Sequence, residues 1–165
     1  MASLITMAPV RGEEGATVKS VGKGPCGLAL HIAGAGPDFV IFHGGFGSWR
    51  HWIGNIEVLA ERFRVLAFDL PGYGDSVGVP EATTPQQYID WVSDEIAAAA
   101  PNGRHLAGFS FGGALAARVA ARLGPRIKRL SLLGPGGFDF PRRPRRSIDC
   151  CWLSTKNERI WVPFD

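Results

Sequence analysis

Long apolar runs are absent from this chain of 165 residues. The longest uninterrupted runs, 39–42 and 96–100, fall far short of the about 18 residues that a membrane-spanning helix needs. Residues 1–10 also lack the basic flank of a secretory signal peptide. We therefore expect a soluble, cytoplasmic protein with no membrane partner.

Cysteine is scarce as well, with three in the chain, of which Cys150 and Cys151 are adjacent. This pattern matches neither a disulfide framework nor the paired C-x-x-C hooks of a zinc site. The Gly-rich segment 134–137 lacks the helix pattern and the downstream acidic residue of a dinucleotide fingerprint. We expect reduced thiols, no metal and no cofactor.

Most of the chain has no excess of either positive or negative charge, although the net charge of the whole chain is +3. Residues 141–165 hold six Lys or Arg against three acids, which leaves 12 of each sign elsewhere. A basic tail could bind nucleic acid or an acidic surface, but no helix-turn-helix, RRM or zinc-finger pattern accompanies it. We favour a solvated charge run and expect no nucleic-acid partner.

The chain is 45% hydrophobic, which is enough for one globular domain with a buried core. Strand-like apolar runs occur at 28–33, 39–42, 64–70, 104–109 and 127–133. Four of these five lack clean polar alternation, which is typical of strands covered on both faces. Helical patterns lie between them, so the sequence predicts the α/β class: a three-layer sandwich with a mostly parallel sheet and helices on both faces.

The expected helices cover about 49–62, 85–100 and 111–123. The second has the clearest start, because Thr84 can act as N-cap, Pro85 suits the first helical position and Gln87 suits the third. Before residue 28 we expect an N-terminal hairpin or arm (1–27), and after residue 140 a basic, poorly ordered tail (141–165).

The strongest chemical signal is Gly108-Phe109-Ser110-Phe111-Gly112, where the strand 104–109 turns into the helix that begins at Phe111. A G-x-S-x-G in this context is typical of a nucleophile elbow. The two glycines let strand and helix pass closely. We expect Ser110 to be a nucleophile and the N–H of Phe111 to be an oxyanion donor.

A second Gly-rich segment, His43-Gly44-Gly45-Phe46-Gly47, follows the strand 39–42. Its backbone can turn an N–H toward the neighbouring strand end, so we expect Gly45, or alternatively Phe46, to be the second oxyanion donor. His43 lies near this site. We favour a structural histidine bonded to nearby backbone over a catalytic one.

Together with Asp69-Leu-Pro-Gly-Tyr-Gly-Asp-Ser76, these motifs resemble the α/β-hydrolase fold family over about residues 28–137. With a serine at the elbow, the chain resembles the esterases, thioesterases, lipases and carbon-carbon bond hydrolases of this family. The resemblance implies acyl transfer to Ser110 from a small ester, thioester or diketone-type substrate. It assigns no catalysis to Asp69, which stands in a structural turn.

The chain departs from that family after Ser110. The general base should be a histidine downstream of the nucleophile, yet His31, His43, His51 and His105 all precede it. We expect only His43 to lie near Ser110. The position of Asp139, just after the strand 127–133, resembles the alternative position of the triad acid in some members of this family.

The family's last strands are also missing, so residues 28–140 look like the first two-thirds of the domain, truncated or changed in reading frame near Phe140. Two functions stay open: an impaired serine hydrolase, or an inactive fragment or binding module with an Arg-rich tail. The uncovered edge of the last strand, 127–133, could also support self-association.

Overall fold

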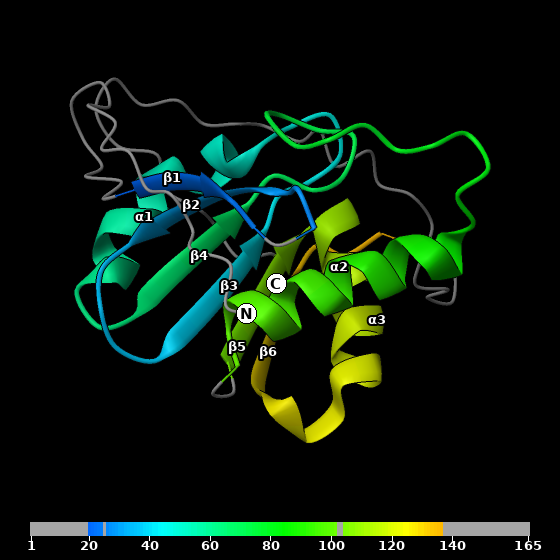
Figure 1. The fold of residues 1–165 in the computed structure, drawn as a ribbon. Coiled ribbons are helices and arrows are strands. Elements are labelled where there is room, and N and C mark those ends of the chain that lie inside the picture. The colour runs from blue at the N-terminus through cyan, green and yellow to red at the C-terminus, as the bar shows by residue number, and fades with distance from the viewer. Residues whose placement is uncertain (1–19, 25, 102–103, 137–165) are drawn as a thin grey trace, which may run out of the picture.

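A computed structural model of the chain describes residues 20–24, 26–101 and 104–136 (Figure 1). Within these residues the chain forms a six-stranded sheet in the order β1-β2-β4-β3-β5-β6. The strands are β1 (Ser20–Lys23), β2 (Ala29–Ala33), β3 (Asp38–Phe42), β4 (Arg64–Phe68), β5 (Arg104–Phe109) and β6 (Ile127–Leu133). The five predicted strands are therefore present within two residues of their expected ends. The predicted tail, 141–165, lies outside the described residues.

Four strands, β4, β3, β5 and β6, are mutually parallel, as the α/β class requires. β2 instead runs antiparallel to β4, and β1 pairs antiparallel with β2. The physical reason is the short link 34–37, which has no room for a crossover helix between β2 and β3. Gly34 adopts φ +74° in this link, and a side chain there would collide with the backbone of Ala60 and Phe63. The sheet is mostly parallel, with a reversed strand pair at one edge.

Two of the expected helices form as the sequence indicated. α2 (Pro85–Ala99) begins with a complete capping box between Thr84 and Gln87. α3 (Phe111–Leu123) starts directly after Ser110. The third expected helix is split into the 3-10 helix η1 (Trp49–Trp52) and α1 (Ile53–Ala60). The Trp52 indole donates to the Phe42 carbonyl at 3.0 Å and so holds this junction against β3.

The sheet separates two apolar layers, which gives the expected three-layer sandwich. On one face α2 and α3 pack against strand residues such as Val40, Phe42 and Leu66. On the other face Trp52 and Ile56 pack against the alternate positions of the same strands. This alternation follows from the two-residue period of a strand.

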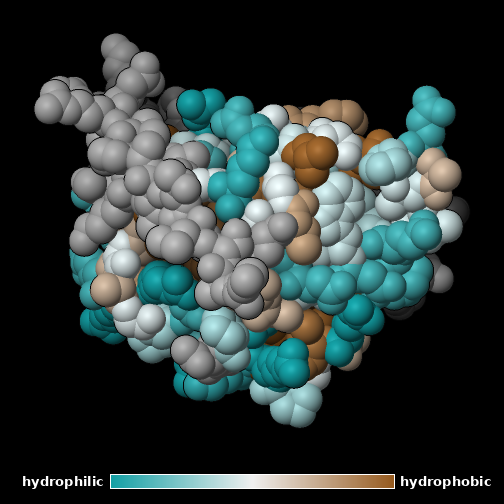
Figure 2. Space-filling model, in the orientation of Figure 1, coloured by the Kyte–Doolittle hydropathy of each residue, from teal (hydrophilic) through white to brown (hydrophobic). Residues whose placement is uncertain are grey.

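β6 differs from the buried strands, because five of its seven residues are exposed, including Leu130 and Leu132. Among the described residues, β6 therefore lacks the cover on both faces that the sequence indicated for four of the five predicted strands. No described strand pairs with its outer edge. On the face drawn in Figure 2, apolar side chains appear as small separate areas between polar ones.

Candidate active site

Ser110 occupies a strained turn between β5 and α3. Its backbone has φ 53° and ψ −117°, a conformation that non-glycine residues rarely adopt and that proteins retain chiefly at functional sites. The turn is held by its neighbours: the Ser110 N–H donates to the Leu133 carbonyl at 2.9 Å. The Ser110 carbonyl accepts from the N–H groups of Gly113, Ala114 and Gly136 at 3.0 to 3.2 Å. A strained, positive-φ serine between a strand and a helix is the local geometry that a nucleophile elbow requires.

The glycines around Ser110 are required by close backbone contacts. A Cβ at Gly108 would collide with the carbonyl oxygen of Gly112. A Cβ at Gly112 would collide with the carbonyl oxygen of His43 and lie 2.8 Å from that of Phe42. The start of α3 thus passes directly over the ends of β5 and β3, as the G-x-S-x-G spacing predicted.

The second Gly-rich segment lies beside this turn. A Cβ built on Gly45 would be 3.8 Å from the Cβ of Phe111, so the two expected oxyanion donors come from adjacent backbone. Among the described residues, neither the Gly45 N–H nor the Phe111 N–H has an acceptor. Phe46 adopts φ 58° and is fully exposed. Two unpaired backbone N–H groups thus lie on adjacent segments beside Ser110.

His43 is fully buried, and both of its ring nitrogens bind backbone. The Leu70 N–H donates to Nε2 at 3.0 Å, so Nδ1 carries the proton and donates to the Gly44 carbonyl at 2.7 Å. Burial lowers the pKa of the His43 imidazole and so favours the neutral ring. No ring nitrogen is left to accept a proton from Ser110, and the contacts match the expected structural histidine.

His51 was not expected near the site, yet it lies there too. Its Nδ1 accepts the Gly44 N–H at 3.2 Å, and its ring centroid lies 5.9 Å from that of Phe109. The 3-10 helix η1 turns the chain back over Gly44 and brings this imidazole close. Sequence spacing did not indicate this contact, because it joins two segments of the folded loop.

The other candidates are separated from Ser110 or lie outside the described residues. His105 is near the opposite end of β5 from Ser110, and His31 belongs to β2. Asp139, the expected acid, falls outside the described residues. The structure therefore brings together Ser110, Gly45 and Phe111, with His43 and His51 behind the oxyanion loop.

Asp69 holds the loop that borders the site. It is buried, and its carboxylate accepts the Trp49 N–H at 2.7 Å and the Asp75 N–H at 3.0 Å. The same loop carries Tyr73, whose ring centroid lies 5.2 Å from that of His43 and 6.1 Å from that of Phe111. These contacts agree with a structural role for Asp69.

The comparison with protein families gives the class. Residues 39–160 match the Alpha/beta hydrolase family, and the match contains the elbow, the oxyanion loop and the Asp69 turn. This chain belongs to the alpha/beta hydrolase family.

Curated relatives include several hydrolases. The chain is 38% identical over 103 residues to a pimeloyl-[acyl-carrier protein] methyl ester esterase of Aeromonas hydrophila, covering 62% of this chain and 39% of that protein. It is 32% identical over 127 residues to a 2-hydroxymuconate semialdehyde hydrolase of a Pseudomonas species, covering 74% and 44%. The chain thus spans about two-fifths of the length of the curated relatives it matches.

Solved structures agree on the fold. A bacterial membrane phospholipase A superposes with a TM-score of 0.66 at 28% identity, over 84% of this chain and 42% of the other. Naproxen esterase from Bacillus subtilis gives 0.63 at 25% identity, over 68% and 41%. In the part of the chain that the structure describes, no helix has both the length and the apolar character needed to cross a membrane.

Proposed function

We propose that this chain carries the nucleophile and the oxyanion-binding backbone of a serine hydrolase, with Ser110 attacking an ester or thioester carbonyl. The observation that carries the proposal is the strained conformation of Ser110 beside the unpaired N–H groups of Gly45 and Phe111. The attacking Oγ and two donors for the developing oxyanion would then act on the same carbonyl.

The surroundings favour an apolar acyl group. Phe46 is fully exposed and Phe111 is 39% exposed, and the Phe111 ring contacts Tyr73 and Tyr88. An aromatic surface beside the nucleophile suits an aliphatic or aromatic acyl chain better than a charged one. Relatives that carry ester-hydrolase names support an ester as the substrate.

The chain alone should be a weak catalyst. No histidine follows Ser110 in the sequence, and both ring nitrogens of His43 already bind backbone. An oxyanion hole without a general base retains a rate enhancement of roughly 10³- to 10⁴-fold over the reaction in water. A complete triad adds about 10⁶-fold to this rate. We therefore expect ester hydrolysis barely above background.

Fluorophosphonate labelling with imidazole rescue tests the proposal. The full chain should label slowly at Ser110, and added imidazole should increase the rate by supplying the missing base. Ser110→Ala should abolish labelling with and without imidazole, whereas Ser131→Ala, at an exposed serine of β6, should change nothing.

One result would overturn the proposed nucleophile, and another would overturn only the expected weak catalysis. Absence of labelling even with imidazole would favour the alternative of a non-catalytic protein. Rapid stoichiometric labelling without imidazole, lost in Ser110→Ala, would show that the chain contains a base. His43→Ala and His51→Ala would then reveal which imidazole supplies it.

A further inference from the structure

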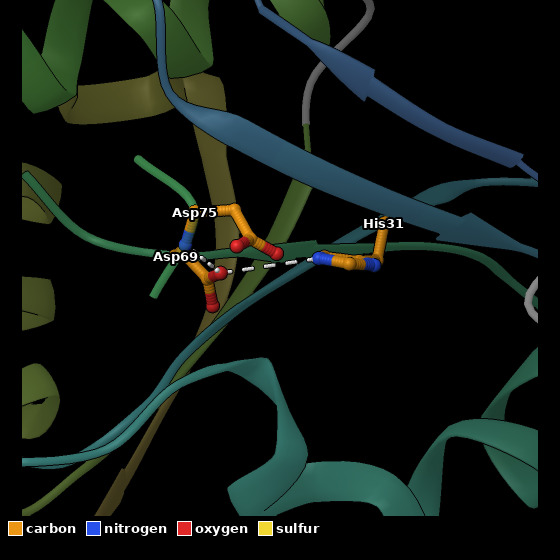
Figure 3. A group of neighbouring side chains, drawn as sticks. All are labelled: His31, Asp69 and Asp75. Carbon is orange, nitrogen blue, oxygen red and sulfur yellow. Dashed lines mark hydrogen bonds and ion pairs between the residues drawn. The ribbon is translucent and has the colours of Figure 1, made fainter. Parts of the chain in front are cut away.

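Three side chains of types that can bind a metal lie close together at the Asp69 turn (Figure 3). His31 comes from β2, Asp69 follows β4, and Asp75 lies in the loop after it. One ligand atom from each residue lies within 4.8 Å of the other two. The His31 Nε2 points at the Asp69 carboxylate, 3.9 Å from Oδ2, which is too long for a hydrogen bond.

The surroundings of the buried His31 side chain are a second observation that points to a ligand. The residue is only 5% exposed, yet neither ring nitrogen has a hydrogen-bond partner among the described residues. An unpaired buried polar group costs about 1–3 kcal/mol, so a protein rarely leaves one without a purpose. The ring is stacked on Trp49 with 4.3 Å between centroids, which fixes its plane.

The electrostatics suit a cation. Burial lowers the pKa of the His31 imidazole, which favours the neutral ring and its free lone pair, while the nearby Asp69 and Asp75 act in the opposite direction. The Asp69 carboxylate is oriented by two backbone N–H groups, as metal-binding carboxylates commonly are. Asp75 is exposed and adds a second negative charge at the open side of the cluster.

We propose that His31, Asp69 and Asp75 bind a divalent transition-metal ion of the zinc type. One imidazole nitrogen with two carboxylate oxygens suits zinc, whereas magnesium and calcium prefer all-oxygen sites. Two ligands of a tetrahedral zinc ion lie about 3.4 Å apart, so Nε2 and Oδ2 need to approach by only about half an ångström.

The ion would act as a structural clamp. It would join β2 to both ends of the segment 69–75, and this segment carries Tyr73 against His43 and Phe111. Binding would thus stabilise the border of the candidate active site without touching Ser110. The proposal stands independently of the hydrolase chemistry.

The test is calorimetric titration of the full chain with zinc chloride. The parent and all variants carry Cys26→Ser, Cys150→Ser and Cys151→Ser, because thiolates bind zinc themselves. We expect one site per chain, with the dissociation constant raised by roughly tenfold or more in His31→Gln and in Asp75→Asn. Asp75 is exposed, so Asp75→Asn keeps the variant informative if His31→Gln fails to fold.

Matched controls change the same residue types elsewhere. His105→Gln and Asp90→Asn should leave the zinc affinity unchanged. Zinc should also raise the melting temperature of the parent, and Asp75→Asn should reduce this increase. The proposal fails if zinc binds no more tightly than roughly 1 mM, or if Asp75→Asn binds it as well as the parent does.

Discussion

Gly112 is the residue on which the geometry of Ser110 most directly depends. It lets α3 begin against the carbonyl groups of Phe42 and His43, and no larger residue fits there without moving backbone. Gly54 in α1 offers the opposite environment, since a Cβ there would meet nothing within 4 Å. The two glycines therefore allow a paired test of the same substitution.

We expect Gly112→Ala to destabilise the fold by about 3 kcal/mol or more, because backbone on both sides must shift. Gly54→Ala should stabilise it by up to about 1 kcal/mol, because alanine loses less conformational entropy in a helix. Urea unfolding followed by circular dichroism measures both changes. Equal effects of the two substitutions would contradict the close contact at Gly112.

At the scale of elements, α2 is joined to the turn between β1 and β2 by one buried acid. Glu95 is fully buried, and its Oε2 accepts the Cys26 N–H at 2.6 Å. Its Oε1 has no partner among the described residues. Desolvation raises the pKa of the Glu95 carboxyl above its ordinary value, with the Cys26 hydrogen bond acting in the opposite direction.

This raised pKa predicts how stability depends on pH. The folded protein holds the Glu95 proton more tightly than the unfolded chain does, so this group's contribution to stability falls as pH rises from its unfolded pKa through its folded pKa. Glu95→Gln keeps an acceptor for the Cys26 N–H and removes the charge. Its free energy of unfolding should exceed that of the wild type at pH 7, with the difference shrinking toward pH 4.

Chemical denaturation at a series of pH values checks this. Glu57→Gln, at an exposed position of α1, is the control and should not show the same pH-dependent gain. A Glu95→Gln protein that is less stable than wild type at pH 7 would indicate that the carboxylate is compensated in the fold.

The elements that the sequence predicted best were those with local signals. Apolar runs located five strands, and the capping box at Thr84 fixed the start of α2. The G-x-S-x-G pattern located the Ser110 turn, because the close contact between Gly108 and Gly112 lies within the motif itself. The direction of β2 and the split of the helix at Trp52 depend on loop length and on long-range packing, which periodicity does not contain.

The same distinction applies to the candidate sites. Gly45 and Phe111 belong to motifs that follow strand ends, and the resemblance to the α/β-hydrolase family implied that these strands are neighbours. In the sequence, His31 is only a polar residue within a predicted strand. Its approach to Asp69 depends on the antiparallel pairing of β2 with β4, in which His31 lies opposite Ala67. No spacing in the sequence indicated this cluster.

At the scale of the whole molecule, we expect the outer edge of β6 to govern association. Leu130 is 40% exposed and Leu132 is 37% exposed, and no described strand pairs beyond them. An apolar strand edge offers backbone and side chains to another chain. We expect oligomers or aggregates at micromolar concentrations, and lysine at these positions should reduce them.

Size-exclusion chromatography with light scattering over a concentration series measures this association. Leu130→Lys and Leu132→Lys should shift the population toward monomer, whereas Val77→Lys, at an exposed loop position, should not. A wild-type chain that stays monomeric across the series would disprove the prediction.

The place of β3 between β4 and β5 also determines when the Ser110 turn can form. β4 follows β3 closely in the chain, but the other side of β3 stays unpaired until β5 is made, after α2. Pairing between distant segments is slower than local helix formation. Gly112 meets the backbone of Phe42 and His43 only once β5 has docked, so we expect the strained serine turn to form late in folding. A chain in which β5 had not docked would lack the contacts that hold Ser110 in its strained conformation.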